Sequence, residues 1–389
     1  MSVNPLVELT KTGQSIWHDG IDRELITSGE LKRLIEEDGL RGVTSNPTIF
    51  EKAIDISDDY SDQLREQAGR QKSASEIYEA LAVRDIQMAA DLLAPVFEKT
   101  DGTDGFVSLE CSPLLAHNTA ATIEEVRYLW RVLDRKNVMI KIPATSEGFP
   151  AIEQCIYEGI NINITLIFSL ASYKKTIEAY LRGLERRVAE GKPVDRIASV
   201  ASFFVSRIDT AVDKRLQERI ARAGSEKEKD KLESLLGRIA IANAKMAYQI
   251  FKEVFHGERF ATLITQGARV QRPLWASTST KNPAYSDVYY VEALIGPETV
   301  NTLPPATLKA FRDHGRVKLS LEENLEGEGA VLARLEEVGI SLDKATQQVL
   351  DEGVTLFSRS FEKLMRSIQL RRDEIAHDLK ASQSSTAPG

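Results

Sequence analysis

The sequence predicts an α/β protein built as a (β/α)8 TIM barrel, and three observations support this prediction. Short apolar segments alternate with longer amphipathic ones from near residue 13 to about residue 315, the order that a parallel sheet with crossover helices requires. Eight such short segments occur. Several of them carry polar residues at every second position, which is typical of strands whose two faces differ.

The elements can be placed in order along the chain. The expected strands cover residues 14–19, 42–46, 106–110, 138–143, 161–168, 199–206, 273–279 and 298–303. Helix starts of the Ser/Thr-x-x-Glu type, in which a hydroxyl and a carboxylate satisfy free amide groups, lie between them at Thr27, Ser73 and Thr122. Residues 226–255 keep helical spacing of their apolar side chains. They predict one long helix, inserted before strand seven.

The pattern divides the chain into three parts. We expect residues 1–321 to form the barrel domain that carries the chemistry. Residues 322–380 show only helical spacing and predict a C-terminal helical extension packed on the barrel. Residues 381–389 are small and polar, and we expect a disordered tail.

Composition narrows the class of protein. The 389 residues include 50 Lys and Arg against 58 Asp and Glu, a net charge of −8, and no basic block; nucleic acid and anionic membranes are therefore not expected partners. Cys111 and Cys155 are too few for a disulfide framework and suit a reducing compartment. The N-terminus lacks the layout of a signal peptide, and no apolar run has the length of a membrane span. We expect a cytoplasmic protein, either a monomer or a homodimer.

Polar side chains converge at the C-terminal ends of three neighbouring strands. Alternation places Glu110, Lys141 and Thr165 on the polar faces of their strands, opposite apolar residues. Barrel chemistry gathers at that end of the strands, and a lysine held there can attack a carbonyl when it is neutral. The alternatives are a structural ion pair between Glu110 and Lys141 and a Lys141 side chain that snorkels to the end of its strand. Asp19, at the end of strand one, suits either an acid and base or a cap of the following turn.

Other kinds of site find little support. The five histidines are far apart and lack ligand spacing, so no metal is expected, and His18 beside Asp19 has no assigned role. For phosphate there are two candidates: Arg207 after strand six, with Ser202 inside that strand, and the run 277–282 after strand seven. The alternative for Arg207 is a salt bridge to Asp209 or to another acid, and the alternative for residues 277–282 is an ordinary polar turn.

Several segments resemble the transaldolase family. GVTSNPTIF (42–50) is similar to its N-terminal signature, and VMIKIPATSEGFPAIEQCI (138–156) is similar to its active-site lysine signature. Further similar segments are FVSLECSPLLAHNT, EGININITLIFSL, ASVASFFVSRIDT, QRPLWASTSTKNP and VNTLPP. The resemblance runs from about residue 13 to beyond 315, and the C-terminal helices resemble those of the longer branch of the family.

The resemblance implies a class I Schiff-base mechanism without cofactor or metal. Lys141 would bind a ketose phosphate, sedoheptulose 7-phosphate or fructose 6-phosphate, and a dihydroxyacetone unit would pass to glyceraldehyde 3-phosphate or erythrose 4-phosphate, in the non-oxidative pentose phosphate pathway. Asp19 would move the C4 hydroxyl proton, and Glu110 with Thr165 would hold the catalytic water. The residues that match the substrate-binding positions are Asn46, Asn163, Ser202, Arg207, Ser279 and Lys281.

Two departures and two rival functions remain. Lys281 stands where better-known shorter members carry arginine, so the bidentate fork is lost. Cys111-Ser112 stands where Val-Asp is expected. One rival is an aldolase that releases free dihydroxyacetone, although such enzymes are much shorter. The other is a non-catalytic barrel scaffold.

Overall fold

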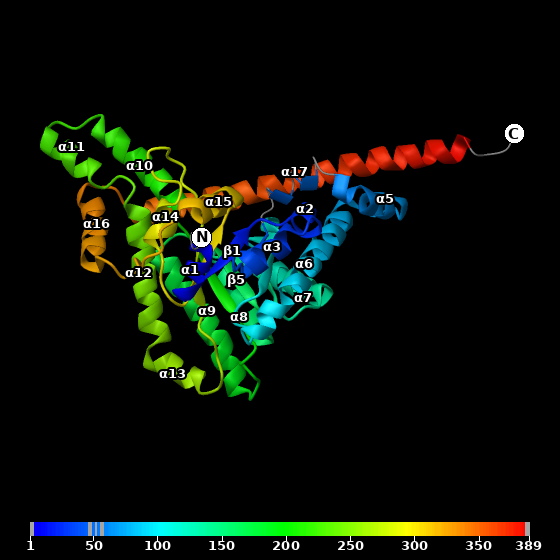
Figure 1. The fold of residues 1–389 in the computed structure, drawn as a ribbon, viewed down its shortest axis with the longest axis horizontal. Helices are drawn as coiled ribbons and strands as arrows, with labels where there is room; N and C mark the ends of the chain where they lie inside the picture. Colours follow the sequence, from blue (N-terminus) through cyan, green and yellow to red (C-terminus); the bar gives the residue numbers. More distant parts are fainter. Residues whose placement is uncertain (1–3, 46–48, 51–52, 55–57, 386–389) are drawn as a thin grey trace.

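A computed structural model describes residues 4–45, 49–50, 53–54 and 58–385 of the chain. Eight parallel strands pair in sequence order, and the last pairs with the first to close a barrel. Figure 1 shows strands at the centre with helices around them. The strands are β1 (Gln14–Asp19), β2 (Gly42–Thr44), β3 (Phe106–Glu110), β4 (Val138–Pro143), β5 (Ile162–Ile167), β6 (Ser199–Phe204), β7 (Arg272–Ala276) and β8 (Thr299–Leu303). The predicted (β/α)8 barrel is confirmed.

The strand bounds differ from expectation mainly at the C-terminal ends. Strands one, three and four agree residue for residue. The expected sixth strand runs too far, because Val205 leaves the extended conformation (φ −104°, ψ −78°) and a helix begins at Ser206. The seventh ends at Ala276, three residues early, and Ser277 has a left-handed φ of +56°. Residue 46 of the second expected strand lies outside the described residues.

Helices connect the strands and cover the outside of the barrel. Those up to β6 are α1 (Pro5–Lys11), α2 (Arg23–Thr27), α3 (Glu30–Glu37), η1 (Asp58–Tyr60), α5 (Ser61–Gly69), α6 (Ala74–Lys99), η2 (Pro113–Leu115), α7 (Thr119–Leu133), α8 (Gly148–Glu158) and α9 (Leu170–Ala189). Those after β6 are α10 (Ser206–Ile220), α11 (Glu226–Glu233), α12 (Ile239–Phe255), α13 (Glu258–Ile264), α14 (Tyr289–Ala293), α15 (Pro305–His314), α16 (Leu325–Glu337) and α17 (Leu342–Ser385).

One of the three predicted capping boxes forms. Ser73 and Glu76 exchange side-chain to backbone hydrogen bonds at the start of α6. The other two predictions are wrong: α2 ends at Thr27, and α7 begins at Thr119, where the side chain of Asn118 caps it instead. An Asn side chain caps a helix as well as a hydroxyl does, so the Ser/Thr-x-x-Glu pattern alone does not fix the start.

The helical insertion before β7 is present, but the prediction of one long helix is wrong. Residues 226–255 form α11 and α12, separated by residues 234–238. Gly237 has a left-handed φ of +68°, and its N–H donates to Asp213 Oδ1 at 3.0 Å. A Cβ at Gly237 would lie 2.6 Å from the Tyr285 ring. The chain therefore turns at the glycine instead of continuing the helix.

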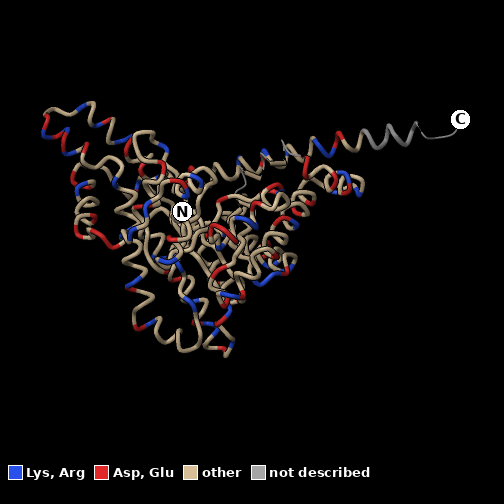
Figure 2. The backbone as a smooth tube through the Cα atoms, viewed as in Figure 1, with Lys and Arg blue, Asp and Glu red and all other residues tan. Residues whose placement is uncertain are grey.

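Basic and acidic residues are interspersed along the outer helices (Figure 2). None of the helices in the described ranges combines the length and apolarity needed to cross a bilayer.

Both C-terminal helices contact the barrel or its surrounding helices. α16 packs against α12, whereas α17 contacts α10, β5, η2, α6 and α5 in turn. Figure 1 shows α17 as one long helix that crosses the molecule and continues beyond it. The helix includes residues 381–385, which we expected in the tail, and 386–389 lie outside the described residues. The division at residues 321 and 322 stays a prediction.

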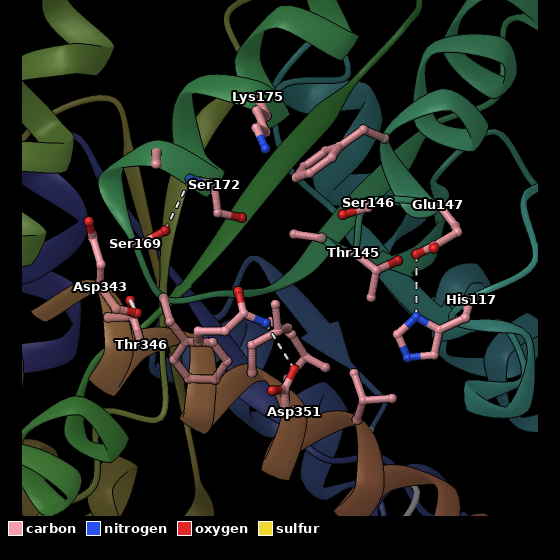
Figure 3. Close-up of a pocket in the computed structure, with 18 residues that line it drawn as sticks. His117, Thr145, Ser146, Glu147, Ser169, Ser172, Lys175, Asp343, Thr346 and Asp351 are labelled. Carbon is pink, nitrogen blue, oxygen red and sulfur yellow. Dashed lines mark hydrogen bonds and ion pairs between the residues drawn. The ribbon is translucent and has the colours of Figure 1, made fainter.

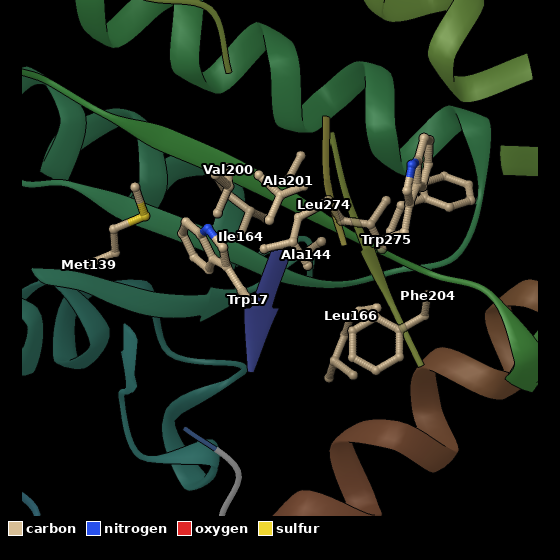
Figure 4. Packing of buried hydrophobic residues seen from close by; sticks show 14 of the residues in the cluster. Trp17, Met139, Ala144, Ile164, Leu166, Val200, Ala201, Phe204, Leu274 and Trp275 are labelled. Carbon is tan, nitrogen blue, oxygen red and sulfur yellow. The ribbon is translucent and has the colours of Figure 1, made fainter. Parts of the chain in front are cut away.

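Close packing inside the barrel depends on Gly42. Trp17 of β1 is fully buried, and Figure 4 shows its indole among the other core side chains. Gly42 of β2 pairs with Trp17 in the sheet. A Cβ at Gly42 would lie 2.5 Å from two atoms of the indole ring. A rigid ring cannot bend away from this contact, so Gly42 is required by the space that Trp17 fills.

We expect Gly42→Ala to lower the free energy of unfolding by about 1–3 kcal/mol, the usual cost of overpacking a core. Urea or thermal unfolding measures it. Gly329→Ala in α16 is the matched control, because a Cβ there meets nothing within 4 Å. This control should be neutral or gain up to about 1 kcal/mol. Equal stability of the two variants would contradict the packing argument.

Candidate active site

Lys141 and Glu110 form a buried ion pair near the C-terminal ends of β4 and β3. The strand register places the two residues side by side. Lys141 Nζ lies 2.5 Å from Glu110 Oε1 and donates to the backbone oxygen of Ser45 at 3.1 Å. Both side chains are 8% exposed. The expected convergence of these two strands is therefore present, and the pair is close enough to pass a proton directly.

Burial shapes the chemistry of Glu110. Loss of solvent raises the pKa of its carboxyl, and the nearby Lys141 ammonium opposes this rise. Glu110 Oε2 has no hydrogen-bond partner among the described residues, and neither does the buried Thr165 Oγ1. Thr165 lies two residues beyond Asn163, the partner of Lys141 in β5, and is opposite Pro143. Buried polar atoms are normally satisfied, so these two oxygens are suited to bind a water molecule or a substrate oxygen.

A layer of polar side chains lies between β3, β5 and β6. Asn163 on β5 donates to Ser108 Oγ at 3.0 Å and accepts from Ser202 Oγ at 2.7 Å. All three residues are buried. The hydrogen bonds fix both ends of the Asn163 amide, and Lys141 is its neighbour in the sheet. Asn163 and Ser202 thus lie in the lysine site, whereas Asn46 lies outside the described residues.

Asp19 is the last residue of β1 and lies at the same end of the barrel as Lys141 and Glu110. Its neighbour His18 faces away from this site. Thr44 Oγ1 donates to Asp19 Oδ1 at 3.2 Å, which ties the carboxylate to β2. His18 faces the other way: its Nδ1 lies 2.7 Å from the Gly20 oxygen, and burial lowers its pKa. The His18 ring lines a cleft with residues of α2, α3 and α15. It therefore takes no part in the Lys141 cluster.

Arg207 and Lys281 line one groove between α10 and α17. The guanidinium of Arg207 lies over the rings of Phe204 and Phe357, at 5.4 and 5.9 Å from their centroids. Lys281 Nζ donates to Ser279 Oγ at 2.7 Å. Burial lowers the pKa of both cations, and the positive charge of Arg207 lowers that of Lys281 further. Two cations that disfavour each other form a site that an anion would stabilise.

The alternative salt bridge from Arg207 to Asp209 is not formed. Asp209 accepts from the Ala240 N–H at 2.7 Å and from the Tyr290 hydroxyl at 2.9 Å. Burial raises the pKa of its carboxyl to about 7. Asp209 therefore joins α10 to α12 and α14 and leaves the Arg207 donors available.

The sequence reasoning missed the residues of α17 in this site. Val354 and Phe357 line the small cavity that contains Lys141, Glu110 and Thr165. Their apolar spacing predicts a helix, but spacing does not reveal which part of the barrel a helix covers. A larger cavity lies beyond Leu166, between α17 and the starts of α8 and α9. Figure 3 shows Thr346 and Asp351 of α17 on one side of it and Ser172 and Lys175 on the other. It contains none of the expected site residues.

Neither cysteine is a reactive thiol in this structure. Cys111 and Cys155 are free and buried. Burial raises the pKa of both, that of Cys155 to about 12, so each stays protonated near neutral pH. Ser112, the other residue of the unexpected pair, donates its backbone N–H to Glu125 at 2.7 Å. The Cys111-Ser112 departure leaves the Glu110 contact with Lys141 in place.

The described residues contain no group of three or more His, Cys, Asp or Glu side chains arranged to hold a metal ion. The chemistry available at the barrel mouth is that of an amine, two carboxylates, a hydroxyl and two cations.

Comparison with known proteins points to one family. A family model described as Transaldolase/Fructose-6-phosphate aldolase matches residues 16–368. The transaldolase of Trichodesmium erythraeum (strain IMS101) is 47% identical over 371 residues, which cover 95% of this chain and 98% of the relative. The transaldolase of Thermobifida fusca (strain YX) is 45% identical over 379 residues, 97% and 99% of the two chains. That of Thiobacillus denitrificans (strain ATCC 25259 / T1) is 44% identical over 366 residues, 94% and 100%.

The buried pair predicts a pH-dependent loss of stability in Lys141→Met. Without the ammonium, the Glu110 pKa, already raised by burial, rises further. The folded protein then keeps a proton that the unfolded chain releases above its ordinary pKa near 4.5, so the free energy of unfolding falls as pH rises. Relative to wild type we expect about 3 kcal/mol less stability at pH 8 and a smaller deficit at pH 5.

Urea unfolding at the two pH values measures this effect. The double variant Lys141→Met/Glu110→Gln is the control, because it lacks the titrating carboxyl and should show the same deficit at both pH values. A deficit in the single variant that does not change with pH would contradict the buried pairing.

Proposed function

Because the chain belongs to the Transaldolase/Fructose-6-phosphate aldolase family and is a transaldolase, we propose that Lys141 carries its reaction as a Schiff base. The proposed donor is sedoheptulose 7-phosphate or fructose 6-phosphate, and the acceptor is glyceraldehyde 3-phosphate or erythrose 4-phosphate. The observation that carries this assignment of the lysine is the contact of Lys141 Nζ with Glu110 at 2.5 Å. The buried Thr165 Oγ1 in the same cavity has no hydrogen-bond partner among the described residues. A purely structural ion pair gives no reason for this hydroxyl, whereas a catalytic lysine needs a group that can hold water.

The first step needs a neutral amine at Lys141. Glu110 takes the proton from Nζ, which the raised pKa of its carboxyl favours. Nζ then attacks the ketone carbon of the donor. The proton returns to the hydroxyl of the adduct, water leaves, and a protonated imine remains on Lys141. Glu110 Oε2 and Thr165 Oγ1 are the groups we propose to hold this water, and the same water later hydrolyses the imine.

Carbon–carbon cleavage follows at Asp19. Its carboxylate takes the proton of the C4 hydroxyl, the bond between C3 and C4 breaks, and its electron pair moves into the imine to give an enamine. An aldose phosphate leaves, and a three-carbon unit stays on Lys141. The enamine then attacks the acceptor aldehyde, while Asp19 returns the proton. The hydrogen bond from Thr44 holds one oxygen of Asp19 at 3.2 Å.

The remaining polar residues position the sugar. Asn163, fixed by Ser108 and Ser202, and Asn46 are proposed to bind hydroxyls of the three-carbon unit. Arg207, Ser279 and Lys281 are proposed to bind the phosphate. Arg207 lies in the first turn of α10, where the helix dipole also favours an anion. Every step uses side chains of this chain, so the proposal includes no cofactor or metal.

We also propose a cytoplasmic location. Sugar phosphates are the partners that the mechanism requires, and both thiols of the chain are free, which a reducing compartment maintains.

Borohydride reduction with fructose 6-phosphate tests the nucleophile and the reaction together. We expect mass mapping to find a three-carbon adduct on Lys141 and on no other lysine. Lys141→Arg should give no adduct, although the charge is kept, because a guanidinium does not lose its proton. An adduct elsewhere, or none in wild type, would contradict the assignment of Lys141.

The same preparation separates transfer from simple release. Erythrose 4-phosphate added before the reductant should remove the three-carbon unit from Lys141 and yield sedoheptulose 7-phosphate. An aldolase of the rival type would instead release free dihydroxyacetone with and without the acceptor.

Asp19→Asn tests the proton transfer at C4. We expect this variant to form the imine but not to cleave it, because the amide cannot take the hydroxyl proton. Borohydride should then trap a six-carbon adduct on Lys141, and turnover should fall by about 10²-fold or more. A three-carbon adduct in Asp19→Asn would assign the base to another residue.

A further inference from the structure

The C-terminal helix passes close to the barrel mouth at Gly353. A Cβ at Gly353 would lie 3.2 Å from Leu166 Cδ2 and 3.6 Å from Arg207 Nη1. Glycine is unfavourable within a helix, and here it stands inside the 44 residues of α17. The side chains of Leu166 and Arg207 explain the glycine, because they leave little space for a Cβ at position 353. Leu166 itself has a left-handed φ of +59°, which is costly for a residue with a side chain.

One turn further on, α17 places an aromatic ring on Arg207. The guanidinium lies over Phe357 of α17 and over Phe204 at the end of β6. Figure 4 labels Phe204 and Leu166 on the side of the core where the ribbon of α17 passes. The two rings come from segments about 150 positions apart in the sequence. The orientation of Arg207 therefore depends on both the barrel and the extension.

The rings hold the guanidinium without occupying its donors. The Arg207 side chain is partly buried and makes no hydrogen bond or ion pair with a described residue, although the charge of Asp19 attracts it. Cation–π contacts involve the face of the guanidinium and leave its N–H groups pointing outward in their plane. Lys281 is a second cation in the same groove, and burial and the charge of Arg207 lower its pKa. This arrangement is preorganised for a tetrahedral anion, because the flexible arginine side chain is ordered before the ligand arrives.

We propose that Phe357 is a positioning residue for the phosphate of the substrate, and that it acts by orienting Arg207. This inference rests on the proposed function, in which Arg207 binds that phosphate. It assigns a role to the C-terminal extension: the phosphate site is incomplete until α17 lies across the mouth. Phe357 also lines the cavity of Lys141, Glu110 and Thr165, so the test must separate this covering role from the orientation of Arg207.

The test compares Phe357→Leu, which keeps an apolar side chain without a π face, with Phe357→Tyr, which keeps the ring. For Phe357→Leu we expect the KM for fructose 6-phosphate to rise about 3- to 30-fold, the range of a partly desolvated cation–π contact. We expect kcat to stay within about twofold, and Phe357→Tyr to restore the KM. Leu370→Ala on the same helix is the control, because Leu370 is 65% exposed, and it should match wild type.

Two further measurements separate orientation of Arg207 from general damage. Calorimetric titration with inorganic phosphate should show the same 3- to 30-fold weakening in Phe357→Leu. In an Arg207→Ala background, Phe357→Leu should add no further weakening, since the two residues would act as one unit. Borohydride trapping of dihydroxyacetone, which has no phosphate, should label Lys141 equally in wild type and Phe357→Leu.

The outcomes are distinct. An unchanged KM and phosphate affinity in Phe357→Leu would overturn the proposal. If Phe357→Leu weakened dihydroxyacetone trapping as much as it weakened phosphate binding, the ring would only cover Lys141, and the proposal would be wrong. Additive effects of Phe357→Leu and Arg207→Ala would also overturn it. Failure of the proposed function has a different signature, because wild type would then give no adduct on Lys141, while the phosphate titrations would still decide the role of Phe357.

Discussion

The site depends on one constraint: two opposite charges are buried side by side, and neither is stable there without the other. Lys141 and Glu110 can be placed this close because neighbouring parallel strands fix their register. Desolvation disfavours both ions, whereas their mutual attraction favours both. The raised pKa of the Glu110 carboxyl favours its taking up a proton. The barrel thus supplies an amine that can become a nucleophile and a carboxyl that can take up its proton.

The surrounding structure keeps this pair in place from three sides. The Ser45 carbonyl accepts from the ammonium, and the Ser45 hydroxyl accepts from the Glu110 backbone N–H. The Asn163 layer lies beside the pair, and the apolar residues of α17 close the cavity above it. A low-dielectric enclosure strengthens each charge interaction inside it. The same enclosure makes the site sensitive to any change that admits solvent.

Much of this architecture could be read from local patterns. Alternation along single strands was sufficient to place Glu110, Lys141 and Thr165 on one rim, because closure of a barrel brings like ends together. Local patterns failed where distant residues decide. Gly237 breaks the inserted helix because of Asp213 and Tyr285, and the partners of Asp209 come from α12 and α14. The position of Phe357 over Arg207 depends on how α17 docks, and no spacing within α17 encodes that.

The order of the chain also sets an order of events during synthesis. All eight strands lie before residue 304, whereas Gly353 and Phe357 are added only near the end. Chains are made from the N-terminus, so all eight strands are synthesised before the part of α17 that covers the lysine cavity. The finished pocket appears only when the last helix has been made and docked. The segment that encloses the site is therefore among the last that synthesis supplies.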